Sequence, residues 1–129
     1  MTRKTILVVE DAALNLDLMV QLLEDDYAIV TAGDGAEGLA AAARDRPDLV
    51  LMDLSLPVMD GWEATRRLKA DPALRHIPVI ALSAHAMRGD AERALAQGCD
   101  DYLSKPVDED LLFALLARWL GPATTGDGP

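Results

Sequence analysis

Short apolar segments alternate with helical segments along the chain, and this alternation most constrains the fold. Runs rich in Val, Ile and Leu predict strands at 5–9, 27–32, 49–53, 78–82 and 101–103, and such runs are typical of strands buried on both faces. Apolar periodicity and helix-start signatures predict helices at about 13–25, 34–44, 60–69, 86–97 and 108–120. The pattern indicates an α/β, doubly wound, three-layer fold around a parallel sheet.

Aspartates mark three of the predicted helix starts. Asp34 and Asp60 each precede a glutamate by three residues, a signature of a helix N-terminus. Asp108 is expected to cap the last helix, and Gly98 is expected to end the fourth.

The composition limits the classes of function. Half of the 129 residues are hydrophobic and 26% are charged, which is typical of a globular protein. The net charge of -10 argues against a nucleic-acid-binding surface. No apolar run approaches the ~20 residues of a membrane span, and no signal peptide is evident. The single Cys99 cannot form an internal disulfide. We therefore expect a cytoplasmic protein with one domain over 1–121 and a flexible tail over 122–129.

Chemically active side chains follow four of the five predicted strands, while the strand at 27–32 ends without any. The residues alone leave the strand order open. If the order is 2-1-3-4-5, the four strands are neighbours and one pocket receives three carboxylates, a hydroxyl and an ammonium, because ligand sites in these folds lie at the carboxyl ends of the strands. These residues are Glu10, Asp11, Asp53, Ser83 and Lys105.

Such a set of groups favours phosphoryl transfer. Three clustered carboxylates repel one another without a cation, and their oxygen ligands suit Mg²⁺. Lys105 and Ser83 would contact phosphoryl oxygens, and Asp53 would be a carboxylate nucleophile that forms an acyl phosphate. The competing interpretation is that Asp53 only caps the turn after its strand.

Four motifs carry a resemblance to a known family: L-V-V-E-D at 7–11, M-D-L-S-L-P-V-M-D-G at 52–61, I-A-L-S-A at 80–84 and Y-L-S-K-P at 102–106. Over about residues 4–120 the chain resembles the receiver domains of two-component response regulators. It is most similar to single-domain regulators and to the receivers of hybrid kinases. The resemblance implies a flavodoxin-like fold with strand order 2-1-3-4-5.

The resemblance also implies roles for individual residues. Asp53 would be the phosphoacceptor, Asp11 a direct Mg²⁺ ligand, and Glu10 a ligand acting through water. The backbone carbonyl of Ser55 would complete the metal ligands. Ser83 and Lys105 would contact the phosphoryl group. Ser83 and Tyr102 would form a switch, and the Lys105-Pro106 peptide would be cis.

The implied partners are proteins. A sensor histidine kinase or histidine phosphotransferase would supply the phosphoryl group. A downstream regulatory protein would bind the face formed by 86–97, 101–103 and 108–120. Neither nucleic acid nor a membrane is an expected partner. The chain would be no enzyme beyond its own phosphotransfer and dephosphorylation.

Three alternatives stay open at this point. The domain could be a passive phosphorelay intermediate. An aspartyl-phosphate hydrolase usually has a second Asp two residues after the nucleophile, where this chain has Ser55. A flavodoxin-like cofactor module is disfavoured because three carboxylates oppose a phosphate-bearing cofactor and no Gly/Ser/Thr-rich loop follows the first strand.

Overall fold

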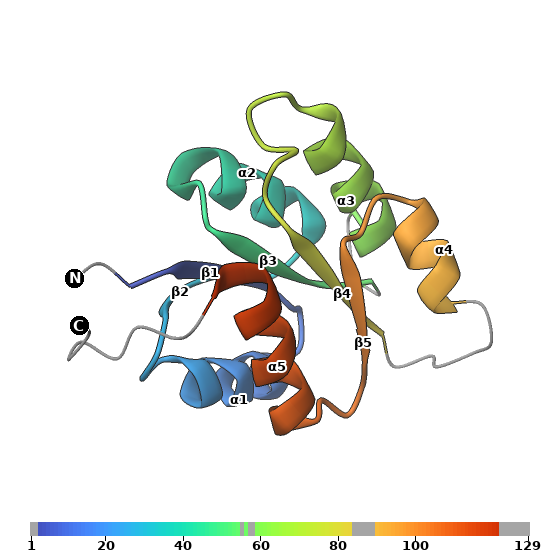
Figure 1. Ribbon diagram of the computed structural model, residues 1–129. Coiled ribbons are helices and arrows are strands. Elements are labelled where there is room, and N and C mark those ends of the chain that lie inside the picture. Colours follow the sequence, from blue (N-terminus) through green and yellow to red (C-terminus); the bar gives the residue numbers. More distant parts are fainter. Residues whose placement is uncertain (1–2, 55, 57–58, 84–89, 122–129) are drawn as a thin grey trace.

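A computed structural model describes residues 3–54, 56, 59–83 and 90–121. Its sheet confirms the predicted class and order (Figure 1). The strands are β1 (Thr5–Val9), β2 (Ala28–Ala32), β3 (Leu49–Asp53), β4 (Val79–Ser83) and β5 (Asp101–Ser104). All neighbouring pairs are parallel, and the order is β2-β1-β3-β4-β5. The strands with chemical groups at their ends are therefore contiguous, and β2 lies at one edge.

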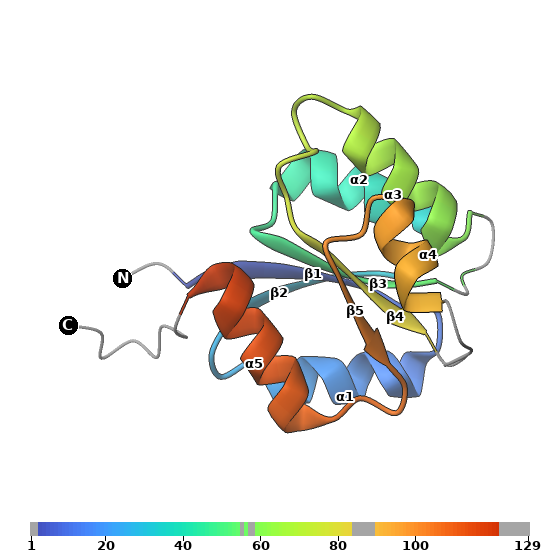
Figure 2. The same cartoon turned by 45° about the vertical axis from the view of Figure 1, so that its right-hand side comes forward.

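Helices cover both faces of the sheet, as Figures 1 and 2 show. They are α1 (Ala13–Leu23), α2 (Gly35–Asp45), α3 (Gly61–Ala70), α4 (Asp90–Ala96) and α5 (Glu109–Leu120). α1 and α5 lie on one face, and α2, α3 and α4 lie on the other. The first residues of the helix predicted at 86–97 lie outside the described part of the chain. Among the described helices, none is long and apolar enough to span a bilayer.

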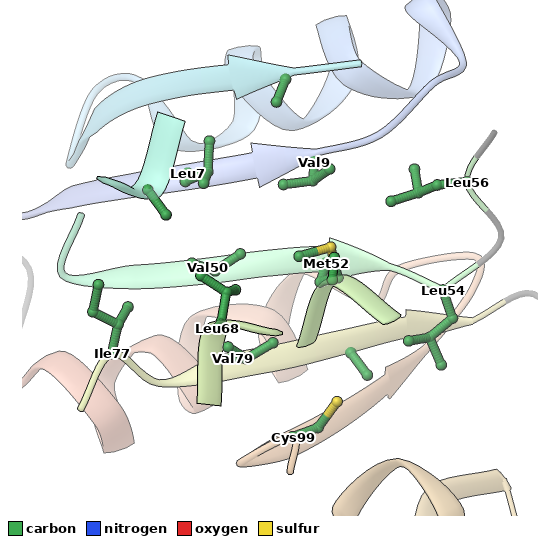
Figure 3. Packing of buried hydrophobic residues seen from close by; sticks show 14 of the residues in the cluster. Leu7, Val9, Val50, Met52, Leu54, Leu56, Leu68, Ile77, Val79 and Cys99 are labelled. Atoms are coloured by element: carbon green, nitrogen blue, oxygen red, sulfur yellow. The ribbon is translucent and has the colours of Figure 1, made fainter. Parts of the chain in front are cut away.

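Two hydrophobic clusters form the core, one on each side of the sheet. Alternate residues of a strand point to opposite faces, so Leu7 and Val9 join the cluster under α2, α3 and α4, while Ile6 and Val8 join the cluster under α1 and α5. Figure 3 shows the first of these clusters. Every residue of β3 and β4 is buried, which explains why these strands appear as continuous apolar runs.

The predicted aspartate caps are confirmed. Asp34 accepts a hydrogen bond from the Glu37 amide at 2.8 Å, and Asp60 accepts one from Glu63 at 2.9 Å. Asp108 accepts one from the Leu111 amide at 3.1 Å, at the start of α5. Each cap satisfies a backbone donor that the first helical turn leaves unpaired.

Gly61 lets α3 begin directly beside the end of β3. A Cβ at this position would overlap the carbonyl oxygen of Asp53, and the Gly61 amide donates to the Leu54 carbonyl at 3.2 Å. Only glycine permits such a close approach. The backbone of Asp53 is thus held by the packing of the helix that follows it.

A partly buried ion pair near the amino-terminal end of β4 joins the last turn of α3 to the residue before β5. The Lys69 ammonium donates to Asp100 Oδ2 at 2.6 Å and to the Ile77 carbonyl at 2.8 Å. The same Asp100 oxygen accepts from the Val79 amide at 2.8 Å. This network fixes the entry into β4, and the sequence pattern did not predict it.

Candidate functional site

Asp53 is the last residue of β3, Glu10 and Asp11 directly follow β1, Ser83 ends β4, and Lys105 follows β5. Because the carboxyl ends of neighbouring parallel strands meet at one edge of a sheet, the predicted residues converge there. Ser55, the predicted donor of a metal-binding carbonyl, lies outside the described residues.

Glu10, Asp11 and Asp53 form an acidic cluster. Each offers one carboxylate oxygen, and these oxygens lie within 4.8 Å of one another. Glu10 and Asp53 are only 3% and 4% exposed, while Asp11 is exposed. The cluster therefore has two buried carboxylates below and one carboxylate at the mouth of the site.

Lys105 lies between the two buried carboxylates. Its Nζ donates to Glu10 Oε1 at 2.8 Å and to Asp53 Oδ2 at 3.0 Å. Burial by itself lowers the pKa of Lys105, but hydrogen bonds to both carboxylates and their negative charges outweigh burial and raise this pKa. The lysine is therefore protonated at neutral pH.

The donor set fits a hard divalent cation. Three carboxylates and one ammonium leave two negative charges uncompensated, and oxygen ligands at this spacing suit Mg²⁺. The cluster therefore agrees with the expected magnesium site, and Asp11 is the most exposed of its three carboxylates.

Ser83 is held beside Lys105 through the backbone. The Lys105 amide donates to the Ser83 carbonyl at 2.8 Å, and Ser83 is only 3% exposed. Asp53 is paired in register with Leu82, the residue before Ser83. The Lys105-Pro106 peptide is cis, which confirms that prediction.

Tyr102 lies on β5, the strand next to β4, which carries Ser83. Its register partner is Ala81, and Ser83, two residues further along β4, shares a face with Ala81. The Tyr102 ring packs against the core cluster under α2, α3 and α4. Its hydroxyl is buried, with no hydrogen-bond partner among the described residues.

A groove next to the site was not predicted. It has a volume of about 500 Å³ and joins Glu10 and Lys105 to Asn15 and to an apolar wall made by α1, the end of β4 and the start of the β5–α5 loop. The wall consists of Leu18, Met19, Leu22, Leu82, Pro106 and Val107.

The sequence did hold a signal for this groove. Leu14 and Leu18 are 71% and 56% exposed, and with Leu22 they form a second apolar row along α1 at a spacing of four residues. The apolar stripe that predicts this helix consists of Leu16, Met19, Val20 and Leu23 and does not include this second row.

The sheet order, the acidic cluster and the lysine at the carboxyl edge together define a receiver domain of two-component signalling. A family model described as the response regulator receiver domain matches residues 6–117, so the chain belongs to this family.

Three relatives cover most of the chain. It is 44% identical over 121 residues to the polar-differentiation response regulator DivK of Brucella anthropi, with 93% of this chain and 98% of DivK covered. The receiver domain of sensor histidine kinase PA1611 from Pseudomonas aeruginosa, with a magnesium ion coordinated in its active site cleft, has a TM-score of 0.85, 39% identity and coverage of 94% and 99%. The receiver domain of Ssk1 from Saccharomyces cerevisiae, co-crystallised with the histidine phosphotransfer protein Ypd1, has a TM-score of 0.83, 27% identity and coverage of 92% and 90%.

Proposed function

We propose that this receiver takes a phosphoryl group from a phosphohistidine onto Asp53 and changes a protein-binding surface in response. The observation that carries the proposal is the position of Lys105, whose ammonium contacts Asp53 at 3.0 Å inside a cluster of three carboxylates. An aspartate that only caps a turn needs no lysine partner. A phosphoryl acceptor needs a cation beside it to neutralise the charge of the transferred group.

The chemistry is a displacement at phosphorus. A carboxylate oxygen of Asp53 attacks the phosphorus, the bond from phosphorus to the donor's imidazole nitrogen breaks, and the electron pair remains on that nitrogen. Lys105 neutralises charge on a phosphoryl oxygen, and the Ser83 hydroxyl donates to another. The site itself supplies this step and the later hydrolysis, and no further enzymatic activity is proposed.

Mg²⁺ is the proposed cofactor. Asp11 and Asp53 would bind it directly and Glu10 through water, with the Ser55 carbonyl as a further ligand by family resemblance. When bound, the ion neutralises negative charge on the transferring group. The spacing of the acidic cluster supports this assignment, as does the magnesium in the PA1611 receiver.

The proposed donor is a histidine kinase or histidine phosphotransferase that docks over the groove. The exposed Leu14 and Leu18 on α1 give an apolar contact surface beside the site, and such a surface on a protein of this size favours a protein partner. The co-crystal of Ssk1 with Ypd1 supports a partner of this class. The net charge of -10 disfavours nucleic acid, and we propose a cytoplasmic location.

The proposed output surface is formed by α4, β5 and α5. Tyr102 leaves a hydroxyl buried and unpaired among the described residues, which is costly and is relieved if the ring turns outward. Phosphorylation would draw Ser83 toward the phosphoryl group and open space behind it for Tyr102. This observation favours a switch over a passive phosphorelay intermediate.

The test is incubation with Mg²⁺ and acetyl phosphate, followed by intact-mass measurement. The parent should gain about 80 Da, one phosphoryl group, and Asp53→Asn should gain none. An equal gain in Asp53→Asn would overturn the proposal.

A further inference from the structure

A shallow depression of about 330 Å³ lies at the sheet edge opposite the acidic cluster. Lys4 precedes β1, Asp48 precedes β3, and Pro78 precedes β4, and all three line it. Trp119 and Leu120 at the end of α5 complete the wall, and Figure 2 shows this end of α5 beside the start of β1. Because the strands are parallel, this depression is separated from Asp53 by the length of the sheet.

The depression gathers cationic side chains that have no partner within the described part of the protein. Most of the lysines and arginines described by the structure contact a carboxylate, a carbonyl or an aromatic ring. The exceptions among these described residues are Lys4, Arg46 and Arg75, and the first two line the depression together with His76. The chain has 22 acidic and 12 basic residues, and most of the described basic side chains contact a group within the protein. Lys4 and Arg46 therefore remain available to an external anion at this place.

Two polar side chains of the wall have internal hydrogen bonds, and Asp48 keeps its negative charge beside the two cations. Asp48 Oδ2 accepts a hydrogen bond from the Thr5 amide at 2.7 Å, and Trp119 Nε1 donates to Asp101 at 3.0 Å. The guanidinium of Arg46 and the ammonium of Lys4 are left as donors, and a guanidinium binds phosphate oxygens in pairs.

Arg46 also has an unusual backbone conformation. It follows α2 with φ 45°, and it is the one non-glycine residue in the described chain with positive φ. Glycine or asparagine fits this helix end with less strain. Arg46 therefore places a cation at the rim of the depression, although arginine is disfavoured in the left-handed backbone conformation.

We propose that this depression binds a small phosphomonoester with a flat apolar body, of the size of a nucleoside monophosphate. Its two negative charges would be matched by Arg46 and Lys4, and the apolar body would lie against the partly exposed Trp119 and Leu120. The volume lies at the lower end of the range for small-molecule sites. The net charge of -10 repels anions in general, so binding has to come from these local cations.

The experiment is an amide-spectrum titration of the full chain in the absence of Mg²⁺ with AMP, inorganic phosphate and adenosine as probes. AMP should shift the resonances around Lys4, Arg46 and Trp119. Phosphate should bind more weakly at the same residues, and adenosine should not bind. Because each charge-assisted contact is strong, Arg46→Asn should weaken AMP binding about tenfold or more.

Two variants separate a specific loss of binding from a folding defect and from a general loss of positive charge. Arg46→Asn should keep or raise the melting temperature, since Asn tolerates the left-handed conformation, so its weaker binding is no folding defect. Arg75→Gln removes an unpartnered cation outside the depression and should bind AMP within about twofold of the parent. The proposal is overturned if AMP shifts no resonance here, if its shifts fall on the acidic cluster, or if both variants weaken binding equally.

Discussion

The ammonium of Lys105 lies 3.0 Å from the carboxylate of Asp53, although the two residues are 52 positions apart in the chain. Both groups are placed by the ends of parallel strands, with β4 between them. Their contact brings the proposed phosphoryl acceptor and its counter-charge together, and the predictions below depend on that arrangement.

The first prediction concerns the exposed carboxylate of the cluster. Asp11 has no ion-pair or hydrogen-bond partner among the described residues, and its neighbours Glu10 and Asp53 repel it by about 1 kcal/mol each at the dielectric of water. Asp11→Asn should therefore be slightly more stable than the parent without Mg²⁺ and should lose the stabilisation that Mg²⁺ gives the parent. Thermal unfolding with and without Mg²⁺ measures both effects. Asp17→Asn, an exposed change on α1, should retain the Mg²⁺ shift; an equal Mg²⁺ shift in Asp11→Asn would remove Asp11 from the ligands.

The second prediction concerns Lys105. Lys105→Met leaves the buried carboxylates of Glu10 and Asp53 without their ammonium, which should lower the free energy of unfolding by about 1–3 kcal/mol. Mg²⁺ should stabilise this variant more than the parent, because the cluster then has a larger uncompensated charge. Lys105→Arg keeps the charge and should show a smaller loss. Denaturant unfolding with and without Mg²⁺ measures these changes in the free energy of unfolding. A smaller stabilisation by Mg²⁺ in Lys105→Met than in the parent would contradict the charge balance.

The third prediction concerns the ion pair at the other end of β4. Lys69→Met leaves Asp100 partly buried without its cation and removes the bond to the Ile77 carbonyl, so the free energy of unfolding should fall by about 1–3 kcal/mol. Arg44→Met is the matched control, because the Arg44–Asp45 pair is exposed and should contribute less than about 0.5 kcal/mol. Equal losses in the two variants would show that the Lys69 network does not stabilise the fold.

The fourth prediction concerns Cys99 at alkaline pH. Burial raises the pKa of the Cys99 thiol, and the charge of Asp100 adds to this effect while Thr65 and Lys69 oppose it. A raised folded pKa means that the stability linked to the neutral thiol is present below the unfolded pKa of about 8.5 and is lost as pH rises through the folded value. The folded protein should therefore react slowly with a thiol reagent even near pH 9, and the unfolded protein should react fast. Fast reaction of the folded chain would show that Cys99 is accessible.

Most of the candidate site could be predicted because its residues stand at strand ends. A polar residue that interrupts an apolar run, such as Asp53, marks a carboxyl end, and the parallel sheet brings these ends together. The residues left the strand order open, and the family resemblance supplied the order that the structure confirms. Helix starts at Asp34, Asp60 and Asp108 were predictable because a cap is a local interaction.

Interactions between distant segments could not be predicted from local patterns. The Lys69–Asp100 pair joins residues 31 positions apart, and either charge could have faced solvent. Boundaries also shifted by small amounts: α1 ends at Leu23 instead of residue 25, and Tyr27 precedes β2 as a buried residue. The depression at Lys4 and Arg46 combines single residues from different loops, and each of them alone resembles an ordinary surface charge.

The most direct test of the central claim is chemical mapping of the phosphorylated residue. The protein is phosphorylated with acetyl phosphate and Mg²⁺, the acyl phosphate is reduced with borohydride to homoserine, and the peptides are sequenced by mass spectrometry. Our account predicts homoserine at position 53, no homoserine at Asp11 and no reduced side chain at Glu10, with no conversion when acetyl phosphate is omitted. Conversion at another carboxylate with position 53 unchanged would contradict it.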